Sequence, residues 1–508
     1  MQLLDFFQQI YLVITPVKMG VLFFTVTLGI IFGALPGLTA TLGVALLTTA
    51  TFNFPTDLAI VALIGIYVGA IYGGSHASIL INIPGTGAAA ATLLDGYPLN
   101  LKGRGGEAIG IATIASFIGT LFGMIWVQFF SPLLLKLALN FTSVEFFLLG
   151  IFGILICGSL TARDLPVKGW IAGFLGLLLT VVGIDPIQGY YRFTFGNPEL
   201  FGGIEVIPVL LGGFAIPQVM SVLRENKPHT AAPARVTNII PPWSIWPRHV
   251  KSILRSGLVG VWVGAIPGVG EDVAAWMSYD VAKRGSKTPE QFGTGIEEGV
   301  IAPETANNSC IGGAIIPLLT LGVPGSPPAA MLLGAIWLHG VRPGPMLSFE
   351  FPHFIPQMAA TLFWASVVML VMGLLMAKIS VRILRTPPAL FMPIVTFFCV
   401  LGSYALGLRV FNLYLMVAFG VLAYFLEEMG YPIAPLVIGM ILGPMVDENL
   451  RRALIGSQGS LLPFVTRPVA VVLLLLILYS LVSQTPWYRR WRRIRRARLA
   501  EKLGEQQI

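Results

Sequence analysis

Four Pro-Gly pairs lie inside apolar stretches of the chain: Pro36-Gly37, Pro84-Gly85, Pro267-Gly268 and Pro324-Gly325. Proline removes a helical hydrogen bond, and glycine lets the backbone approach a ligand. In a membrane, such a break is tolerated only where the backbone is buried in protein or lines a cavity. A single break can be a kink that only shapes packing. Four breaks in two matched pairs favour a binding site.

The residues after two of these breaks are suited to restart a helix. Thr86 and Ser326 are good N-cap residues, and Pro327 and Pro328 suit a first helical turn. Each restart points a positive dipole end and unpaired N–H groups toward one place, which suits a carboxylate. We therefore expect the substrate-binding residues to be Pro84, Gly85, Thr86, Pro324, Gly325, Ser326, Asn82 and Ser75.

Polar residues near the breaks suggest a coupling ion. Glu271 follows the third break, and Glu304 begins the run ETANNS. Carbonyl, hydroxyl and carboxylate oxygens suit Na⁺, whereas a carboxylate alone can carry H⁺. The alternative for Asn and Ser is hydrogen bonding between helices. The expected cation-binding or coupling residues, with sodium as the candidate metal, are Gly37, Thr39, Gly268, Asp272, Asn307 and Asn308. No cofactor is expected besides Na⁺ or H⁺.

The composition requires that these residues lie in a membrane protein. Hydrophobic residues make up 55% of the 508 residues and charged residues only 11%, where soluble domains average about a quarter. The apolar stretches are too long for barrel strands. We therefore predict an all-α polytopic membrane protein with about 12 transmembrane helices, some of them broken or re-entrant.

The breaks repeat along the chain. GIIFGALPGL at 29–38 matches GVWVGAIPGV at 260–269, an offset of 231, and IPGT at 83–86 matches VPGS at 323–326, an offset of 240. Loop cations follow the second break in the first copy and the first break in the second copy, which predicts inverted structural repeats. The expected organisation is two membrane repeats with a cytoplasmic linker and a basic cytoplasmic tail: 1–222, 223–252, 253–484 and 485–508.

The net charge of +8 is concentrated at the C-terminus. Residues 489–508 hold seven Arg, one Lys and two Glu, a net of +6. Because this tail follows an apolar run and the aromatic residues Trp487, Tyr488 and Trp491, it indicates a cytoplasmic C-terminus beside membrane lipid rather than a nucleic-acid arm.

Several enzyme classes lack their motifs. The dipeptide Gly-Lys is absent, so there is no Walker A loop, and the scattered Cys157, Cys310 and Cys399 form no zinc signature. Two alternatives stay open. An intramembrane serine hydrolase would use Ser75 with His76 or His339, and a passive anion pore would need no coupling ion.

The motifs as a group resemble the large membrane subunit of tripartite tricarboxylate transporters, the TctA family. The likeness covers roughly 20–460 and rests on GAIYGGSHASILINIPGTGAAAATLLDGYPL, GAIPGVGEDVAAWMSYDVAKR and EGVIAPETANNSCIGGAIIPLLTLGVPGSPPAAMLLGA. The pattern G-x3-G-x2-P-G-x-G is complete from Gly260 to Gly270, whereas Thr39 replaces its last glycine in the first copy.

The resemblance implies a non-enzymatic secondary transporter of the bacterial cell inner membrane. It implies cation-coupled symport of a tricarboxylate or dicarboxylate, a small four-span membrane partner, and a periplasmic solute-binding protein that delivers the substrate.

Overall fold

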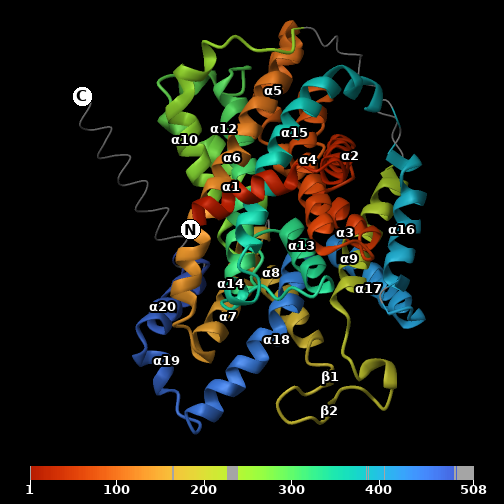
Figure 1. The fold of residues 1–508 in the computed structure, drawn as a ribbon, viewed down its shortest axis with the longest axis vertical. Helices are drawn as coiled ribbons and strands as arrows, with labels where there is room; N and C mark the ends of the chain where they lie inside the picture. Colours follow the sequence, from red (N-terminus) through yellow and green to blue (C-terminus); the bar gives the residue numbers. More distant parts are fainter. Residues whose placement is uncertain are drawn as a thin grey trace.

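The computed structural model describes residues 2–162, 165–225, 238–384, 386, 388–405, 407–485 and 488. Helices dominate this part of the chain (Figure 1). Residues 226–237 of the proposed linker, and the basic tail apart from 485 and 488, lie outside the described residues. The described end of the linker region already belongs to a helix that begins at Ile245.

The first part of the described chain contains the following elements: α1 (Gln2–Val13), α2 (Pro16–Ala34), α3 (Ala40–Ala50), α4 (Thr56–Ile81), η1 (Gly87–Ala89), α5 (Leu93–Leu99), η2 (Asn100–Arg104), α6 (Gly105–Ala138), α7 (Ser143–Thr161), α8 (Pro166–Leu179), β1 (Gly183–Ile184), β2 (Tyr191–Arg192), η3 (Pro198–Leu200) and α9 (Val206–Glu225). The second part contains α10 (Ile245–Gly264), α11 (Gly270–Gly285), η4 (Pro289–Gln291), α12 (Glu298–Leu321), α13 (Pro327–Leu338), α14 (Leu347–Glu350), α15 (Phe354–Ile383), η5 (Pro388–Leu390), α16 (Met392–Ala405), α17 (Val410–Glu428), α18 (Ile433–Gly456), α19 (Leu462–Thr466) and α20 (Pro468–Ser483).

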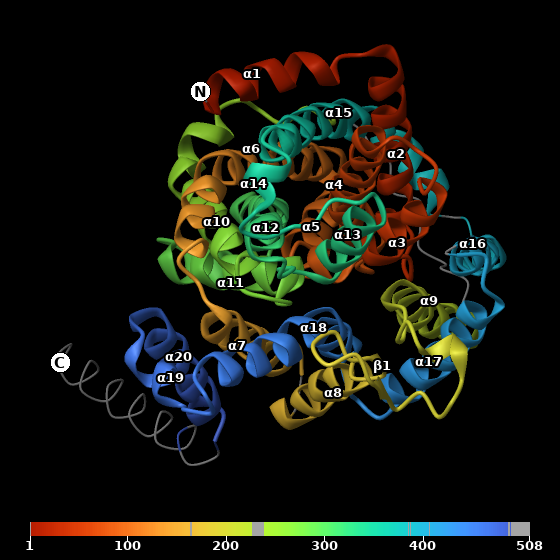
Figure 2. The ribbon, with the colours of Figure 1, turned by 60° about the horizontal axis from the view of Figure 1, so that its bottom comes forward.

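The helices that flank the four breaks form one cluster. Helix α2 packs on α4, and α10 packs on α12. Helix α6 packs on α12, and α15 packs on α4, so each half supplies a long helix to the broken helices of the other half. Helix α1 lies across α15, where the indole of Trp364 donates to the Ile10 carbonyl. The remaining long helices lie along one side of the cluster (Figure 2).

The two halves make equivalent close contacts at equivalent glycines. A Cβ on Gly33 would collide with the Ala70 carbonyl, and a Cβ on Gly264 would collide with the Cys310 carbonyl. Residues 33 and 264 are 231 apart, and residues 70 and 310 are 240 apart, which are the two offsets of the sequence motifs. The same holds for the second breaks, because a Cβ on Gly85 would meet the Gly33 carbonyl and a Cβ on Gly325 the Gly264 carbonyl. The motif glycines therefore allow broken helices to approach closely.

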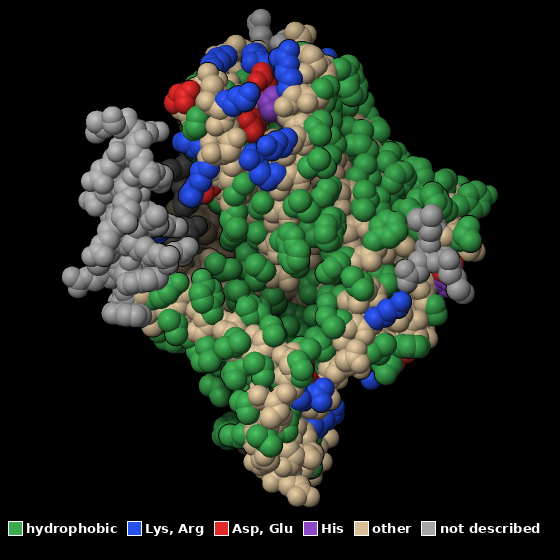
Figure 3. Space-filling model, turned by 90° about the vertical axis from the view of Figure 1, so that its left-hand side faces the viewer, with side chains coloured by type: hydrophobic (Ala, Val, Ile, Leu, Met, Phe, Trp, Pro, Cys, Tyr) green, Lys and Arg blue, Asp and Glu red, His purple; other side chains and the backbone are tan. Residues whose placement is uncertain are grey.

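The lengths of the helices and the side chains on the surface identify a multi-pass membrane protein. Eight of the described helices are long and apolar enough to cross a membrane, and five shorter apolar helices accompany them. Figure 3 shows hydrophobic side chains over the middle of one face, with Lys and Arg gathered toward one end. Such a distribution suits a hydrocarbon layer bounded by charged ends. The total of about 12 crossings stays a prediction.

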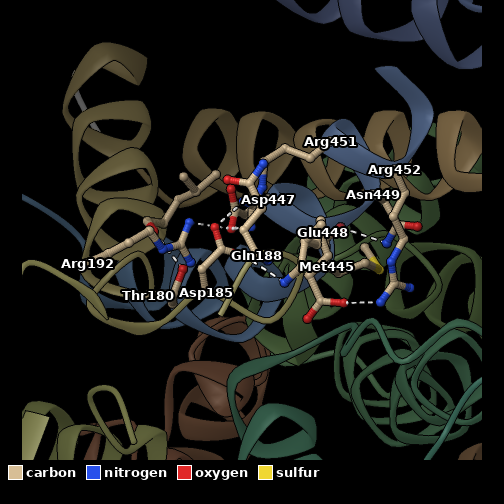
Figure 4. Close-up of polar contacts among 12 residues, drawn as sticks. Thr180, Asp185, Gln188, Arg192, Met445, Asp447, Glu448, Asn449, Arg451 and Arg452 are labelled. Carbon is tan, nitrogen blue, oxygen red and sulfur yellow. Dashed lines mark hydrogen bonds and ion pairs between the residues drawn. The ribbon is translucent and has the colours of Figure 1, made fainter. Parts of the chain in front are cut away.

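A short hairpin lies outside the helices, although the sequence predicted no strands. Strands β1 and β2 pair antiparallel, with Ile184 opposite Tyr191. Arginines of α18 and β2 hold the hairpin in place, because Arg451 pairs with Asp185 and Arg192 pairs with Asp447 (Figure 4). The hydrogen bond from Arg451 holds the pKa of Asp185 well below its usual range.

Candidate functional site

The second break of the second half runs from 322 to 326 and is closed on all sides. Gly322 ends α12 in the left-handed conformation (φ 70°), and Ser326 begins α13 as its N-cap. The Ser326 hydroxyl accepts from the Ala329 amide at 3.3 Å, as the sequence predicted. Pro327 and Pro328 have no N–H, and the Ala330 amide donates to the Ser326 carbonyl. The first turn of α13 therefore leaves no amide for a ligand, and the Ser326 hydroxyl is the side-chain donor at this break.

A buried chain of polar groups begins at this hydroxyl. Ser326 Oγ lies 2.7 Å from the Tyr67 hydroxyl of α4, and Tyr67 also hydrogen-bonds to Glu271 Oε1 of α11. Tyr67 and Ser326 are fully buried, and Glu271 is 2% exposed. Three elements from both halves therefore meet through hydrogen bonds in a low-dielectric environment, where each bond is stronger than in water.

The matching break of the first half runs from 82 to 86 and is more open. Asn82 ends α4 with φ 59°, the counterpart of Gly322. Asn82, Pro84 and Gly87 are exposed. The expected cap is not formed, because Thr86 makes no side-chain cap bond and only the single turn η1 follows. The buried Thr86 hydroxyl finds no hydrogen-bond partner among the described residues. An unpaired buried donor costs about 1–3 kcal/mol, which a ligand oxygen could recover.

The first turn of α11 lies between the two breaks. The Gly268 amide donates to Pro324 O and the Gly270 amide to Gly325 O, both at 3.1 Å. On the other side of this turn, a Cβ on Gly87 would collide with the Asp272 carboxylate. Asp272 itself is exposed. The structure therefore brings the two breaks to opposite sides of one short turn.

Asn307 and Asn308 belong to a second buried cluster on α12. The Asn307 amide donates to Ala88 O at 3.0 Å, just past the first break. Asn308 donates to Asn307 Oδ1 at 2.7 Å. Beside them, the Glu304 carboxylate accepts from Thr92 at 2.5 Å and from Ser116 at 2.9 Å. These bonds match the alternative of hydrogen bonding between helices, and they connect α12 to η1 and α6.

The segment after the first break is anchored by Asp95, which the sequence analysis did not single out. Its fully buried carboxylate accepts from the amides of Gly293, Gly295 and Ile296 at 2.8 to 3.1 Å. The Tyr279 hydroxyl adds a bond at 2.8 Å. Asp95 therefore fastens α5 to the loop before α12 in the other half.

The remaining predicted residues lie away from this turn. Gly37 has φ 95° and borders Val222 and Gln218 of α9. Thr39 caps α3 by accepting from the Leu42 amide at 3.2 Å. No hydrogen bond among the described residues joins this break to the one at 82–86, in contrast to the two bonds of the second half.

The side chains of the hydrolase alternative do not form a nucleophile and base pair. The Ser75 hydroxyl donates to the Tyr72 carbonyl at 2.7 Å, within its own helix. The His76 ring is instead 2.7 Å from the Tyr72 hydroxyl and 2.5 Å from Ser380 Oγ. Nucleophilic catalysis needs the base within reach of the nucleophile, so this arrangement does not favour it.

Tyr67 is the contact that sequence reasoning missed. A tyrosine inside a long apolar run gives no signal of its own, since aromatic residues are common there. One clue was available: Tyr67 and Asn307 differ by the offset of 240. Each reaches the restart of the opposite half, Tyr67 at Ser326 and Asn307 at Ala88.

The structure is a multi-pass membrane protein whose discontinuous helices pair between two halves. Such an arrangement is typical of secondary transporters. The model of the tripartite tricarboxylate transporter TctA family matches residues 19–438. The chain therefore belongs to this family, which makes it a component of a tripartite tricarboxylate transporter. The family is one of transporters rather than enzymes, and a tripartite system implies further subunits, including a binding protein.

Two relatives come from Agrobacterium vitis. An uncharacterized 52.8 kDa protein in the TAR-I ttuC' 3' region is 36% identical over 462 residues, which cover 91% of this chain and 92% of that protein. An uncharacterized protein in the TAR-II ttuC' 3' region is 37% identical over 215 residues, which cover 42% of this chain and 89% of that protein. No solved structure matches the chain.

Proposed function

We propose that this chain carries an organic carboxylate, a tricarboxylate or dicarboxylate, into the cell across the bacterial inner membrane. Uptake is coupled to Na⁺ or H⁺, and no other cofactor takes part. A periplasmic binding protein delivers the substrate, and a small four-span subunit completes the complex. The basic C-terminal tail faces the cytoplasm, as does the linker at 223–252.

One observation supports this proposal more than any other. The breaks at 82–86 and 322–326 lie on either side of the first turn of α11, and each presents a hydroxyl, from Thr86 and Ser326. Hydroxyl donors in a low-dielectric site suit a carboxylate. In this proposal Pro84, Gly85, Pro324 and Gly325 shape the site.

The other predicted residues keep secondary places in the proposal. Asn82 lies at the exposed start of the first break, and the buried Ser75 lies on α4, the helix that leads into this break. The remaining coupling residues, with sodium as the candidate ion, are Gly37, Thr39, Gly268, Asp272, Asn307 and Asn308.

The equivalent glycine contacts in the two halves support two structural repeats. We propose that the repeats are inverted and that one moves against the other during transport. In such transporters the substrate site lies where the repeats meet, which is where Tyr67 and Asn307 cross between halves.

Uptake of a radiolabelled carboxylate tests the proposal. Candidate substrates come from a ligand-binding screen on the partner solute-binding protein. The complex is then reconstituted in liposomes with Na⁺ and pH gradients varied separately. We expect accumulation against a gradient, abolished by an ionophore, which a passive anion pore cannot give. Absence of carboxylate uptake by the complete complex under every gradient would refute the proposal.

Thr86→Ala tests the site itself. We expect a lower apparent affinity for the carboxylate, about fivefold or more, since each net hydrogen bond contributes about 1 kcal/mol. Thr361→Ala is the matched control, because this buried threonine donates to Gln357 within its own helix at 2.9 Å. Wild-type affinity and rate in Thr86→Ala would show that Thr86 does not bind the substrate.

A further inference from the structure

Glu271 is a buried carboxyl group without a cationic partner. It is 2% exposed, and no Lys or Arg among the described residues forms an ion pair with it. The titratable groups around it are Tyr67 of α4, Cys310 of α12 and the neighbouring Asp272, and none of them is positively charged. Burying an unpaired carboxylate is costly, so the site favours a neutral carboxyl group in this conformation.

The hydrogen bonds of Tyr67 can run in either direction. With Glu271 ionised, the Tyr67 hydroxyl donates to Glu271 and accepts from Ser326. With Glu271 protonated, the acid donates to Tyr67, and Tyr67 donates to Ser326 Oγ. Both arrangements satisfy the geometry, because tyrosine and serine hydroxyls donate and accept equally well.

The direction of these bonds decides what Ser326 offers a ligand. Ser326 Oγ already accepts from the Ala329 amide. When Tyr67 also donates to it, both lone pairs are used and its own hydrogen is free to bind an oxygen of the substrate. When Glu271 is ionised, that hydrogen is instead held by Tyr67 and by the Glu271 carboxylate itself, which also hydrogen-bonds to Ser326. Protonation of Glu271 should therefore strengthen the binding of a carboxylate at Ser326, and binding of the carboxylate should favour protonation of Glu271.

We propose that Glu271 is the proton-carrying residue of this transporter and that Tyr67 passes its protonation state to Ser326 at the substrate site. This inference rests on the proposed function and specifies its coupling ion. The neighbour of Glu271 on α11, Asp272, is exposed. Ser326 is fully buried in this conformation, so the substrate reaches it only after the repeats move.

Another buried glutamate, Glu304 of α12, serves as the internal comparison. It also lacks an ion pair among the described residues, but each of its carboxylate oxygens accepts from a hydroxyl, of Thr92 and of Ser116. None of its hydrogen-bonded partners belongs to the break at 322–326. We therefore expect Glu304 to stabilise the packing of α12 on α6 and to take no part in coupling.

Infrared spectroscopy of the purified protein tests the proton directly and needs no substrate. The wild type should show the carbonyl stretch of a protonated carboxylic acid, shifted in D₂O, and Glu271→Gln should lose that band. Thermal unfolding in detergent shows whether the variant is folded. A band that persists unchanged in folded Glu271→Gln would overturn the proposal, even if no substrate has been identified.

Transport by the reconstituted complex tests the coupling. With the membrane potential held at zero and a pH gradient of one unit, each coupled proton supports about tenfold accumulation, because one pH unit corresponds to 1.36 kcal/mol. Glu271→Gln and Tyr67→Phe should only equilibrate the labelled carboxylate, while exchange of labelled for unlabelled substrate stays detectable in both. Exchange shows that these variants still bind and carry the substrate.

Two matched controls complete the design. Glu304→Gln removes a different buried glutamate, and Tyr72→Phe removes a buried hydroxyl of α4 that contacts His76 and Thr113 rather than Glu271. Both should keep proton-driven accumulation. Uncoupling by Glu304→Gln, coupled uptake by Glu271→Gln, or uptake driven by Na⁺ without a pH gradient would each overturn the proposal. Failure of the wild type to take up any carboxylate would instead count against the proposed function.

Discussion

The breaks at 82–87 and 322–327 occupy equivalent places in the two halves but differ in how they are held. Both begin with a left-handed residue, Asn82 and Gly322, and both pack against a glycine of the preceding helix pair. The second break continues into a capped helix, and its hydroxyl belongs to a hydrogen-bonded chain. The first continues into a single turn, lies partly exposed, and leaves the Thr86 hydroxyl unpaired.

The two breaks share their backbone packing but differ in the side chains that surround them. The shared part is the close backbone approach that motif glycines permit. The difference arises from the partners: Tyr67 and Glu271 surround Ser326, whereas Asp95 fixes the first break from a distance. We infer that the first break is poised to take a ligand and that the second responds to the coupling ion. Three sets of substitutions test the comparison.

Alanine at Gly85 or Gly325 should have the largest effect, and the effect should be similar at both sites. Each new Cβ would collide with a backbone carbonyl, of Gly33 or Gly264, which cannot move aside. Overpacking of this kind costs about 1–3 kcal/mol or more. Size-exclusion chromatography in detergent should show a strong loss of folded protein. Gly20→Ala is the control, since nothing lies within 4 Å of its Cβ position. A normal yield of folded protein for Gly85→Ala, but not for Gly325→Ala, would show that the two breaks do not share the same backbone packing.

Asp95→Asn should come next and act on the first break. The three backbone N–H groups all reach Oδ1, whose place the carbonyl oxygen of Asn can take, so the new NH₂ group replaces Oδ2 against the Tyr279 hydroxyl. Loss of the negative charge weakens all of these hydrogen bonds, at a cost of about 1–3 kcal/mol. The melting temperature should fall. In the exposed control Asp280→Asn, loss of the surface pair with Arg284 should change it little. Equal melting temperatures for wild type and Asp95→Asn would mean that another contact anchors α5.

The smallest of the three effects should be the difference in melting temperature between Ser326→Ala and Thr86→Ala. Ser326→Ala removes a helix cap, which costs about 1 kcal/mol, and also a partner of Tyr67. Thr86→Ala removes a buried hydroxyl with no partner among the described residues, so its melting temperature without ligand should equal or exceed that of the wild type. Ser366→Ala is a further reference, since that buried hydroxyl donates to Phe363 in its own helix. An equal fall in melting temperature in both variants would show that the two breaks are held alike.

Much of the architecture could be predicted from the sequence, because it depends on local composition. Long apolar runs indicate membrane helices, and Pro-Gly pairs interrupt helices wherever they occur. The breaks lie where predicted, and Ser326 caps α13 as expected. The cap expected at Thr86 was wrong, because the chain after it forms one short turn held by Asp95 and Asn307 instead of a continuous helix.

The sequence alone determined a helical membrane protein of the TctA family, with two pairs of matched helix breaks, because composition and motif spacing are properties of the chain itself. Only the tertiary structure decided which groups meet at those breaks. Tyr67, Glu271 and Ser326 are separated by up to 259 positions, and no local pattern encodes their contact. Their meeting depends on how α4, α11 and α13 pack, and close packing is a property of the whole fold.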